Sequence, residues 1–394
     1  MENKCVVVGV TAGIAAYKIC QLVSSLTKQG DEVHVIMTKD AEKFVTPLTF
    51  QTLSKQKVIT DMFTVDYIPD VHHISLAKKA DLFVIAPATA NIIAKVSNGI
   101  ADDLLTTTFL AATCPKLIVP AMNTYMLNNP ITQANITKCR EYGMHVMEAY
   151  AGYLACGDLG AGRLPDPEDI EDAITSLIEK DRYLTGKNIL ISAGATREEI
   201  DPVRYITNHS SGKMGYALAR AARNAGANVT LISGQTNLRK PYGINQINVN
   251  SASEMYDAVI SEFDHSDVTI MAAAVADYTP VEKADQKIKK SEGNWSLNLQ
   301  RTQDILHTIG EKKKEYQMII GFAMETENLM ENAEKKLHEK NVDYIIANSL
   351  KDIGAGFGVD TNVVKIVSAH SVENLGLLSK DDTAKEILRH CLKK

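Results

Sequence analysis

The chain has 394 residues, of which 45% are hydrophobic and 23% charged, so it exceeds a single hydrophobic core and has the composition of a folded protein rather than a disordered or fibrous one. A net charge of −6 gives it no overall attraction to nucleic acid. No apolar run approaches the roughly 18 residues of a membrane helix, and the first residues lack the layout of a secretory signal, so we expect a cytoplasmic protein that binds neither nucleic acid nor membrane.

Six cysteines are scattered along the chain without any C-x-x-C pair: Cys5, Cys20, Cys114, Cys139, Cys156 and Cys391. This spacing indicates neither a zinc site nor a disulfide framework. It still allows a single reactive thiol.

The first forty residues have the pattern of one βαβ unit. Residues 5–10 form an apolar run, residues 13–30 have helical spacing that ends at Gly30, and residues 31–38 return to β-branched alternation. Two later apolar segments, 81–91 and 116–123, end in Pro, Ala and Asn, as expected for buried parallel strands whose carboxyl ends open into ligand loops. The first half is therefore predicted to be a doubly wound α/β domain.

The same order of elements begins again in the second half. A strand and turn at 186–201, a helix at 212–227 and a strand at 228–233 are predicted there, and residues 266–277 echo residues 80–91, either by duplication or as common architecture. A segment dense in Gly and Pro, followed by a polar helix through Glu179, places the boundary near Thr185. We expect two doubly wound, Rossmann-like domains, residues 1–184 and residues 185–394.

Gly9 and Gly13 follow the first predicted strand and open the first helix, where backbone N–H groups and the positive helix end can hold a phosphate. A tight turn that packs the helix explains them equally well. The G-x-G-x-x-G fingerprint is missing, and Gly212-Lys213 is followed by Met214 rather than by the Ser or Thr of a Walker A motif.

Three polar residues of the first half are candidates for chemistry. His73, beside His72, is either catalytic or structural. Asn123 lies just beyond the predicted strand 116–120, where its amide either orients a substrate carboxylate or caps a turn. Cys156 lies in a glycine-flanked segment that can swing over a pocket and deliver a proton, although most cysteines are buried and inert.

Four segments, in chain order, resemble the flavin-dependent cysteine decarboxylases, in particular phosphopantothenoylcysteine decarboxylase: GVTAGIAAYK, HISLAKKADLFVIAPATAN, PAMNTYM and ACGDLGAGR. The resemblance implies a flavodoxin-like domain with FMN, in which His73 is the essential histidine, Asn123 binds the carboxylate and Cys156 is the proton donor. The FMN contacts that it implies are Gly9, Thr11, Gly13, Thr38, Ala88, Thr89 and Met122. Leu127 departs from the family, in which we expect an aromatic residue at this position.

The chemistry of that family explains these parts. Loss of CO2 from the cysteine moiety leaves a carbanion without an electron sink, and oxidation of the thiol to a thioaldehyde supplies one. The resemblance implies that FMN accepts and returns the hydride, while Cys156 provides the proton.

In the second half, a polar segment precedes a predicted helix and has the composition of an anion site at a helix N-terminus: Arg204, Asn208, His209, Ser210, Ser211 and Lys213. Capping of the helix by serine is the alternative. Asp277 ends a predicted strand, where it holds Mg²⁺ or a nucleotide group, or is simply solvated.

Basic residues further along have the charge to neutralise a triphosphate. The run at 287–290 carries three lysines, although such a run is often only a charged surface. Lys336 and Lys340 are four residues apart on a predicted helix, so they share a face and reach one anion, or pair with Glu334 and Glu339.

Four segments of this half are similar to phosphopantothenate–cysteine ligase of the bacterial type: DPVRYITNHSSGKMG, AAAVADY, KIKK and GFAMETE. This resemblance implies that CTP with Mg²⁺ activates the carboxylate of 4'-phosphopantothenate as an acyl cytidylate, from which the amine of cysteine displaces CMP. Arg204, Asn208 and Ala274 would bind the acyl intermediate, and Lys287 with Asp277, the candidate magnesium ligand, would serve the phosphates. The implied CTP contacts are Met271, Ala272, Ala273, Asp277, Lys287, Gln303, Asp304, Ile305, Leu306, Phe322, Lys336 and Lys340, of which Gln303 departs from the family's N-P-D-I-V.

These resemblances together predict a bifunctional enzyme that makes 4'-phosphopantetheine from 4'-phosphopantothenate, cysteine and CTP. They also imply a homo-oligomer with trimeric flavin domains and dimeric ligase domains. A two-domain NAD(P)-dependent oxidoreductase is one alternative, and the missing dinucleotide fingerprint counts against it. A non-catalytic flavin- or nucleotide-binding regulator is another, against which stand the intact His73, Asn123, Cys156, Asn208 and Lys287.

Overall fold

The computed structural model describes residues 4–62, 72–289, 294–325, 329–349 and 359–393. It divides the chain into two compact units, Met1–Ile178 and Glu179–Lys394. Among the described residues, every helix is too short or too polar to cross a lipid bilayer.

The N-terminal unit is built on five parallel strands in the order β2-β1-β3-β4-β5. This is the order of flavodoxin-like folds, in which the strand order reverses between β1 and β3. The strands are β1 (Cys5–Val10), β2 (Glu32–Met37), β3 (Leu82–Ala88), β4 (Lys116–Pro120) and β5 (His145–Val146). Because helices cover both faces, β1 and β3 are apolar and buried along their whole length, which confirms the predicted α/β fold.

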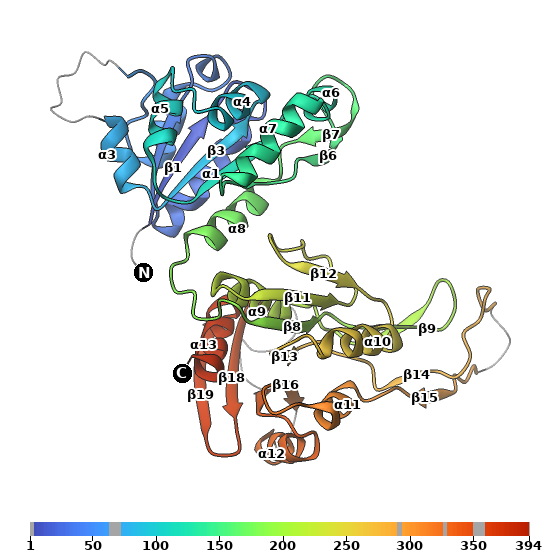
Figure 1. Cartoon of the computed structure of the whole chain (residues 1–394). Helices are drawn as coiled ribbons and strands as arrows, with labels where there is room; N and C mark the ends of the chain where they lie inside the picture. Colours follow the sequence, from blue (N-terminus) through green and yellow to red (C-terminus); the bar gives the residue numbers. More distant parts are fainter. Residues whose placement is uncertain (1–3, 63–71, 290–293, 326–328, 350–358, 394) are drawn as a thin grey trace. The chain divides into compact units, whose positions relative to one another are not determined.

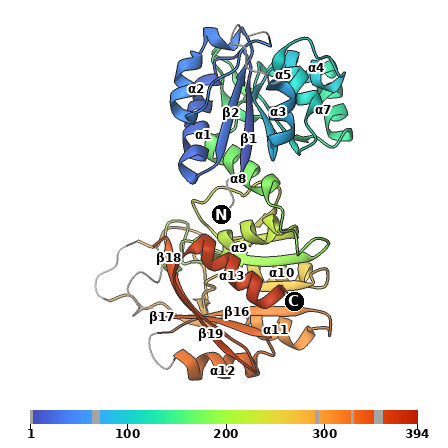
Figure 2. The same ribbon diagram turned by 90° about the vertical axis from the view of Figure 1, so that its left-hand side faces the viewer.

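Helices pack on both faces of this sheet, as Figure 2 shows. One face carries α1 (Ala16–Gln29), α2 (Pro47–Ser54) and α8 (Pro167–Ile178). The other carries α3 (His72–Lys79), α4 (Ala90–Ser97), α5 (Leu104–Ala111) and α7 (Pro130–Glu141). Helix α1 ends where the sequence predicts, because Gly30 adopts the left-handed conformation (φ 99°) that closes a helix.

The glycine-flanked segment around Cys156, predicted as one that can swing over a pocket, forms the tip of a β-hairpin. Strands β6 (Tyr150–Tyr153) and β7 (Leu159–Arg163) pair antiparallel, next to the short helix α6 (Thr124–Leu127) (Figure 1). Gly162 has φ +129°, and a Cβ atom there would lie 2.0 Å from the carbonyl oxygen of Met122. The close approach lets Met122 N donate to Gly162 O (3.0 Å) and fixes the hairpin beside the end of β4.

The C-terminal unit has an eight-stranded sheet in the order β12-β11-β8-β13-β16-β17-β18-β19. The first six strands are parallel, in the 3-2-1-4-5-6 order of dinucleotide-binding folds. Two antiparallel strands extend them. The bounds are β8 (Asn188–Ala193), β11 (Asn228–Ser233), β12 (Asn245–Asn248), β13 (Val268–Met271), β16 (Met318–Glu325), β17 (Tyr344–Ser349), β18 (Thr361–Val367) and β19 (Val372–Ser379).

Helices α9 (Lys213–Asn224) and α13 (Lys380–Leu392) cover one face of this sheet, and α10 (Ala252–Phe263), α11 (Ile305–Lys312) and α12 (Leu329–Glu339) cover the other (Figure 1). The capping residue of α9 is Gly212, with φ 78° and no side-chain cap, so the serine caps considered as an alternative are not used.

Two small hairpins stand beyond the carboxyl ends of the parallel strands. They are β9 (Arg197–Glu199) with β10 (Tyr205–Thr207), and β14 (Tyr278–Pro280) with β15 (Leu299–Arg301).

Candidate active sites

Two adjoining hollows lie at the carboxyl ends of β1, β3 and β4, where doubly wound folds bind their ligands. The Cys156 hollow has a volume of about 640 Å³ and lies between the β1–α1 turn, the β3 and β4 ends and the β6–β7 hairpin. The Lys95 hollow has a volume of about 740 Å³ and is lined by the ends of β1 and β2 and by α4 and α5. Ala12, Thr89 and Met126 line both, so the two hollows form one continuous region.

In the Cys156 hollow, Asn123 both caps a helix and faces the thiol. Its Oδ1 accepts a hydrogen bond from Tyr125 N at the start of α6 (2.8 Å), and its Nδ2 lies 3.4 Å from Cys156 Sγ and 3.4 Å from Asp158 Oδ2. Cys156 Sγ in turn donates to Asp158 Oδ2 (3.3 Å). The structure therefore brings an amide, a thiol and a carboxylate together at the hollow's edge.

Asp158 was missed by the sequence reasoning. The sequence feature that could have identified it is its position two residues after Cys156, at the turn of the hairpin. Recognising that signal required knowing that β6 and β7 pair, so that the carboxylate folds back to the thiol and to Asn123.

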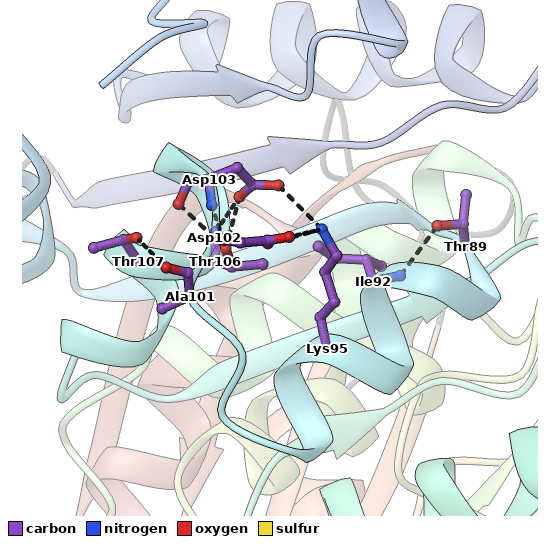
Figure 3. Close-up of polar contacts among 8 residues, drawn as sticks. All are labelled: Thr89, Ile92, Lys95, Ala101, Asp102, Asp103, Thr106 and Thr107. Carbon is purple, nitrogen blue, oxygen red and sulfur yellow. Dashed lines mark hydrogen bonds and ion pairs between the residues drawn. The ribbon is translucent and has the colours of Figure 1, made fainter. Parts of the chain in front are cut away.

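Hydroxyl and charged groups make the Lys95 hollow polar. Thr11 Oγ1 donates to Pro87 O (2.6 Å) and accepts from Thr89 N (3.3 Å), which ties the end of β1 to the end of β3. Figure 3 shows Lys95 between Asp102 and Asp103, with Nζ 2.8 Å from an oxygen of Asp102. This ion pair holds the pKa of Asp102 below its usual value.

The residues implied for FMN lie in three places. Gly13 and Met122 line the Cys156 hollow, Thr11 and Thr38 line the Lys95 hollow, and Thr89 lines both. Gly9 and Ala88 are buried within their strands. A Cβ atom on Gly9 would lie 2.4 Å from Leu105 Cδ1, so this glycine lets α5 pack closely against β1.

A flavin fits this pair of hollows. Alanines, Ile14 and Met122 form much of the Cys156 hollow, which suits a flat apolar ring, and the nearest atom to a Cβ built on Gly13 is 4.0 Å away. The adjoining Lys95 hollow offers the hydroxyl of Thr38 and the ammonium of Lys95 to a polar tail. Their volumes lie in the usual range for cofactor sites.

His73 is not brought to these groups within one copy of the chain. It lies in the first turn of α3, half-buried, and is absent from the described residues that line either hollow. Figure 1 shows α3 well apart from α6 and the β6–β7 hairpin.

A third hollow, of about 480 Å³, lies at the carboxyl ends of β13 and β16 and is named here after Phe322. The residues implied for CTP that line it are Met271, Ala273, Asp277, Gln303, Asp304, Ile305, Leu306, Phe322, Lys336 and Lys340. Ala272 and Lys287 are absent from its lining. Gln303, which differs from the family's motif, therefore lines the hollow together with Asp304, Ile305 and Leu306.

The two lysines of the Phe322 hollow are engaged with protein groups. Lys336 Nζ donates to Phe322 O (2.9 Å), and Lys340 Nζ pairs with Asp304 Oδ2 (2.8 Å). Although partial burial acts in the opposite direction, Lys340 lowers the pKa of Asp304 below its usual value. Asp304 also accepts from His307 N (2.9 Å) and so caps α11.

Three lining residues from the β14–β15 hairpin were missed: Tyr278, Arg301 and Thr302. Tyr278 and Arg301 are register partners across the hairpin. Within the described part of the chain, the Arg301 guanidinium makes no hydrogen bond or ion pair, so its charge is available to a ligand. Neither strand of this hairpin is long enough to give a periodic signal in the sequence.

Of the three residues implied for the acyl intermediate, Asn208 and Ala274 lie beside this hollow. Asn208 Nδ2 is 3.2 Å from Ala274 O and 3.4 Å from Val275 O, and Val275 lines the hollow. Arg204 and Lys287 belong to another cluster, since Arg204 Nη2 donates to Ile288 O (3.1 Å).

Among the described residues, the one group with three metal-ligating side chains in reach of one another is Cys5, Glu32 and His34, at the opposite edge of the N-terminal sheet from the hollows. Glu32 is already paired with Lys79 there, and burial raises the pKa of Cys5 to about 12. Asp277 therefore lines the Phe322 hollow, but among the described residues it belongs to no group of three side chains that could bind a metal ion together.

Each half of the chain matches a known protein family. Residues 1–179 match the flavoprotein family, and residues 184–394 match the family of the DNA/pantothenate metabolism flavoprotein C-terminal domain. The coenzyme A biosynthesis bifunctional protein CoaBC of Bacillus subtilis (strain 168) is 50% identical over 394 residues, 99% of this chain and 97% of that protein. The protein of the same name from Borreliella burgdorferi is 43% identical over 390 residues, 98% of this chain and 99% of that protein. A cysteine/cysteine sulfinic acid decarboxylase from an unknown prokaryotic organism is 44% identical over 354 residues, 88% of this chain and 99% of that protein.

Proposed function

Since this chain belongs to the family of coenzyme A biosynthesis bifunctional proteins, we propose that its two units divide two consecutive reactions between them. The enzyme joins cysteine to 4'-phosphopantothenate and decarboxylates the resulting 4'-phosphopantothenoylcysteine to 4'-phosphopantetheine. We assign decarboxylation to residues 1–184 and CTP-dependent ligation to residues 185–394. The observation that carries this assignment is the 50% identity that runs through both halves at once.

In the decarboxylase, Gly13, Thr38, Thr89 and Met122 would hold FMN. When bound, FMN supplies the two-electron acceptor that makes loss of CO2 from the cysteine moiety feasible. Asn123 binds the substrate carboxylate through Nδ2, and Cys156 holds at Sγ the proton that is finally delivered to carbon. Asp158 accepts that hydrogen in the free enzyme, so the thiol must turn from Asp158 to the substrate before the proton is delivered.

In the ligase, the Phe322 hollow would hold CTP, with Mg²⁺ on the triphosphate beside Asp277. The carboxylate of 4'-phosphopantothenate, held near Asn208 and Ala274, attacks the α-phosphorus and expels pyrophosphate. The amine of cysteine then attacks the acyl carbon and CMP leaves. Lys336 and Lys340 would stabilise the phosphate charge once CTP competes for them with Phe322 O and Asp304.

We further propose a cytoplasmic homo-oligomer, with flavin units in trimers and ligase units in dimers. The position of His73 supports an oligomer. It lies on α3, away from Asn123 and Cys156, so a second copy would have to bring a histidine to each Cys156 hollow.

The test is the visible absorption spectrum of the purified protein, followed by addition of 4'-phosphopantothenate, cysteine, CTP and Mg²⁺ while CO2 and pyrophosphate are measured. Flavin bands and both products are expected. Pyrophosphate from a colourless protein would remove the decarboxylase assignment, and colour without either product would favour the regulator.

The relative that is a cysteine/cysteine sulfinic acid decarboxylase provides a second candidate, an enzyme that acts on cysteine directly. The same assay decides between the two when 4'-phosphopantothenate and CTP are omitted. Our proposal expects no CO2 from cysteine alone.

A further inference from the structure

Asp201 is an acidic residue whose side chain is fully buried, with 0% exposed, in the turn between β9 and β10. A buried carboxylate is tolerated only where hydrogen bonds and opposite charge replace water. Its Oδ1 accepts from Val203 N and from Arg204 N, both at 2.9 Å, and so closes the turn. Its Oδ2 accepts from the Arg204 guanidinium, with Nε at 2.9 Å, and from Ile288 N at 3.2 Å.

This carboxylate fixes the direction of the Arg204 side chain. An arginine has five N–H donors. Nε and Nη2 of Arg204 are occupied by Asp201 and by Ile288 O. Within the described residues, Nη1 has no partner, so its two N–H donors are left to a ligand. The Arg204 guanidinium also holds the pKa of Asp201 well below its usual range, which keeps the carboxylate charged.

The same carboxylate fixes the backbone next to Lys287. Ile288 is held twice, through its N–H by Asp201 and through its carbonyl by Arg204. The segment is attached to the same turn a second time, because Ala284 N donates to Ile200 O (3.0 Å). Lys287 therefore lies between two anchored points of the chain although it is 86 residues from Asp201 (287 − 201).

We propose that Asp201 is a positioning residue of the ligase site, which holds Arg204 and the Lys287 backbone in one arrangement for binding the phosphopantothenoyl group. The proposal rests on the ligase function argued above. Arg204 has a long, exposed side chain, and most of the segment before Lys287 is exposed. Without the contacts of Asp201, binding of the substrate would have to order both, which would weaken its affinity.

The single tryptophan of the chain reports on this arrangement. Trp295 is 49% exposed, and the Arg204 guanidinium lies over its ring at 5.3 Å from the centroid. A change in the position of Arg204 should therefore change the access of a neutral quencher such as acrylamide to Trp295.

The test variant is Asp201→Asn in the full-length holoenzyme. The amide oxygen can replace Oδ1 and keep the turn, but the amide nitrogen then presents hydrogens to three donors that previously shared Oδ2. We expect KM for 4'-phosphopantothenate in pyrophosphate release to rise roughly 10- to 100-fold, the range for losing a charge-assisted hydrogen bond. Because Lys287 is absent from the lining of the Phe322 hollow, KM for CTP should change by less than about twofold, and acrylamide quenching of Trp295 should increase.

Asp264→Asn is the matched control, because it removes a surface ion pair with Lys314 (2.8 Å) from the same unit. Neither KM nor quenching should move in that variant. Decarboxylation of supplied 4'-phosphopantothenoylcysteine should be unchanged in both variants and shows that the N-terminal unit is folded, while a melting curve checks the C-terminal unit.

Wild-type KM and quenching in Asp201→Asn would overturn the proposal. If that variant melts at a lower temperature and loses ligation altogether, Arg204→Lys decides, because a lysine keeps the charge but cannot bond Asp201 and Ile288 O together. The same rise in KM there supports the proposal, and wild-type behaviour refutes it. Absence of pyrophosphate release from the unmodified enzyme would instead refute the ligase function, and the quenching comparison would still test the link from Asp201 to Arg204.

Discussion

Cys156 differs from the other five cysteines in its surroundings. It is exposed at the tip of the β6–β7 hairpin, whereas Cys5, Cys139 and Cys391 are buried and Cys20 and Cys114 are half-buried. Burial raises the pKa of Cys5 to about 12, of Cys139 to about 11 and of Cys391 to about 12. Since the thiolate is the nucleophile, these three thiols are almost entirely unreactive near neutral pH.

We therefore expect iodoacetamide at pH 8 to label Cys156 first in the native enzyme. Raised thiol pKa values of 11 to 12 leave roughly one part in 10³ to 10⁴ as thiolate at that pH, so the buried cysteines should react only after unfolding. Peptide mass spectrometry with and without denaturant measures this. Labelling of Cys391 as fast as Cys156 in the native protein would contradict the expected order.

The Arg301 guanidinium lines the Phe322 hollow without a hydrogen-bond or ion-pair partner among the described residues. Lys336 and Lys340 each have a protein acceptor, so Arg301 brings the uncommitted positive charge to the Phe322 hollow. Arg301→Gln should raise KM for CTP roughly tenfold, the size expected for one charge-assisted hydrogen bond, and leave KM for 4'-phosphopantothenate unchanged. Initial rates of pyrophosphate release measure both constants.

The control for this change is Arg301→Lys, which retains the charge and should recover most of the affinity for CTP. An increase confined to KM for 4'-phosphopantothenate would show that Arg301 serves the acyl side of the site instead.

At the scale of elements, apolar runs were sufficient to predict β1, β3 and β8, because each is largely buried by its neighbours and needs no polar alternation. No strand was predicted in the β6–β7 segment, since its glycines weaken any β signal and three of them, Gly152, Gly157 and Gly162, have positive φ. The contact of Asp158 with Asn123 and that of Asp201 with Ile288 N join segments that are 35 and 87 residues apart, which no local pattern encodes.

The close packing of this hairpin gives a prediction for Gly162. In Gly162→Ala, the new Cβ would meet Met122 O at 2.0 Å in a strained backbone conformation, so the hairpin must move away from Asn123. A displacement of about 1 Å in a catalytic group can lower the rate roughly 100-fold. Decarboxylation of supplied 4'-phosphopantothenoylcysteine should fall by that order, while ligation continues.

Gly376→Ala provides the comparison, because nothing lies within 4 Å of a Cβ at that glycine. It should leave both activities intact. Unchanged decarboxylation in Gly162→Ala would mean that the hairpin does not hold Cys156 in place.

At the scale of the whole chain, the echo between residues 80–91 and 266–277 has a structural basis. In each unit the echoed strand, β3 or β13, pairs with the first strand of its sheet, β1 or β8, on the side opposite to the second strand. The strand order reverses at this point, which opens a crevice. Residues just beyond both strands line the hollows: Thr89 is the first residue after β3, and Ala273 is the second after β13. The sequence could therefore indicate where both sites lie, but not that two antiparallel strands extend the second sheet.

Residues 179–184 lie at the boundary between the two units, and their packing shows to which unit they belong. Leu184 is 3% exposed in the core beneath α9 and α13, and its N–H donates to Ala225 O (2.8 Å). Lys393 pairs with Asp181 (2.7 Å) and lies over the ring of Tyr183. These residues therefore pack as part of the C-terminal unit, and a fragment 179–394 should be more stable than a fragment 185–394.

Burial of one leucine contributes about 1.5–3 kcal/mol, and 1 kcal/mol shifts the melting temperature of a unit this size by about 2–4 °C. The shorter fragment should consequently melt at least about 3 °C lower by circular dichroism, with CTP-dependent pyrophosphate release retained by the longer one. Leu184→Ala in the longer fragment should reproduce much of this loss, because it removes the buried side chain and keeps the backbone hydrogen bond to Ala225. Equal melting temperatures for the two fragments would show that residues 179–184 only connect the units, and Thr185 would then mark the start of the ligase.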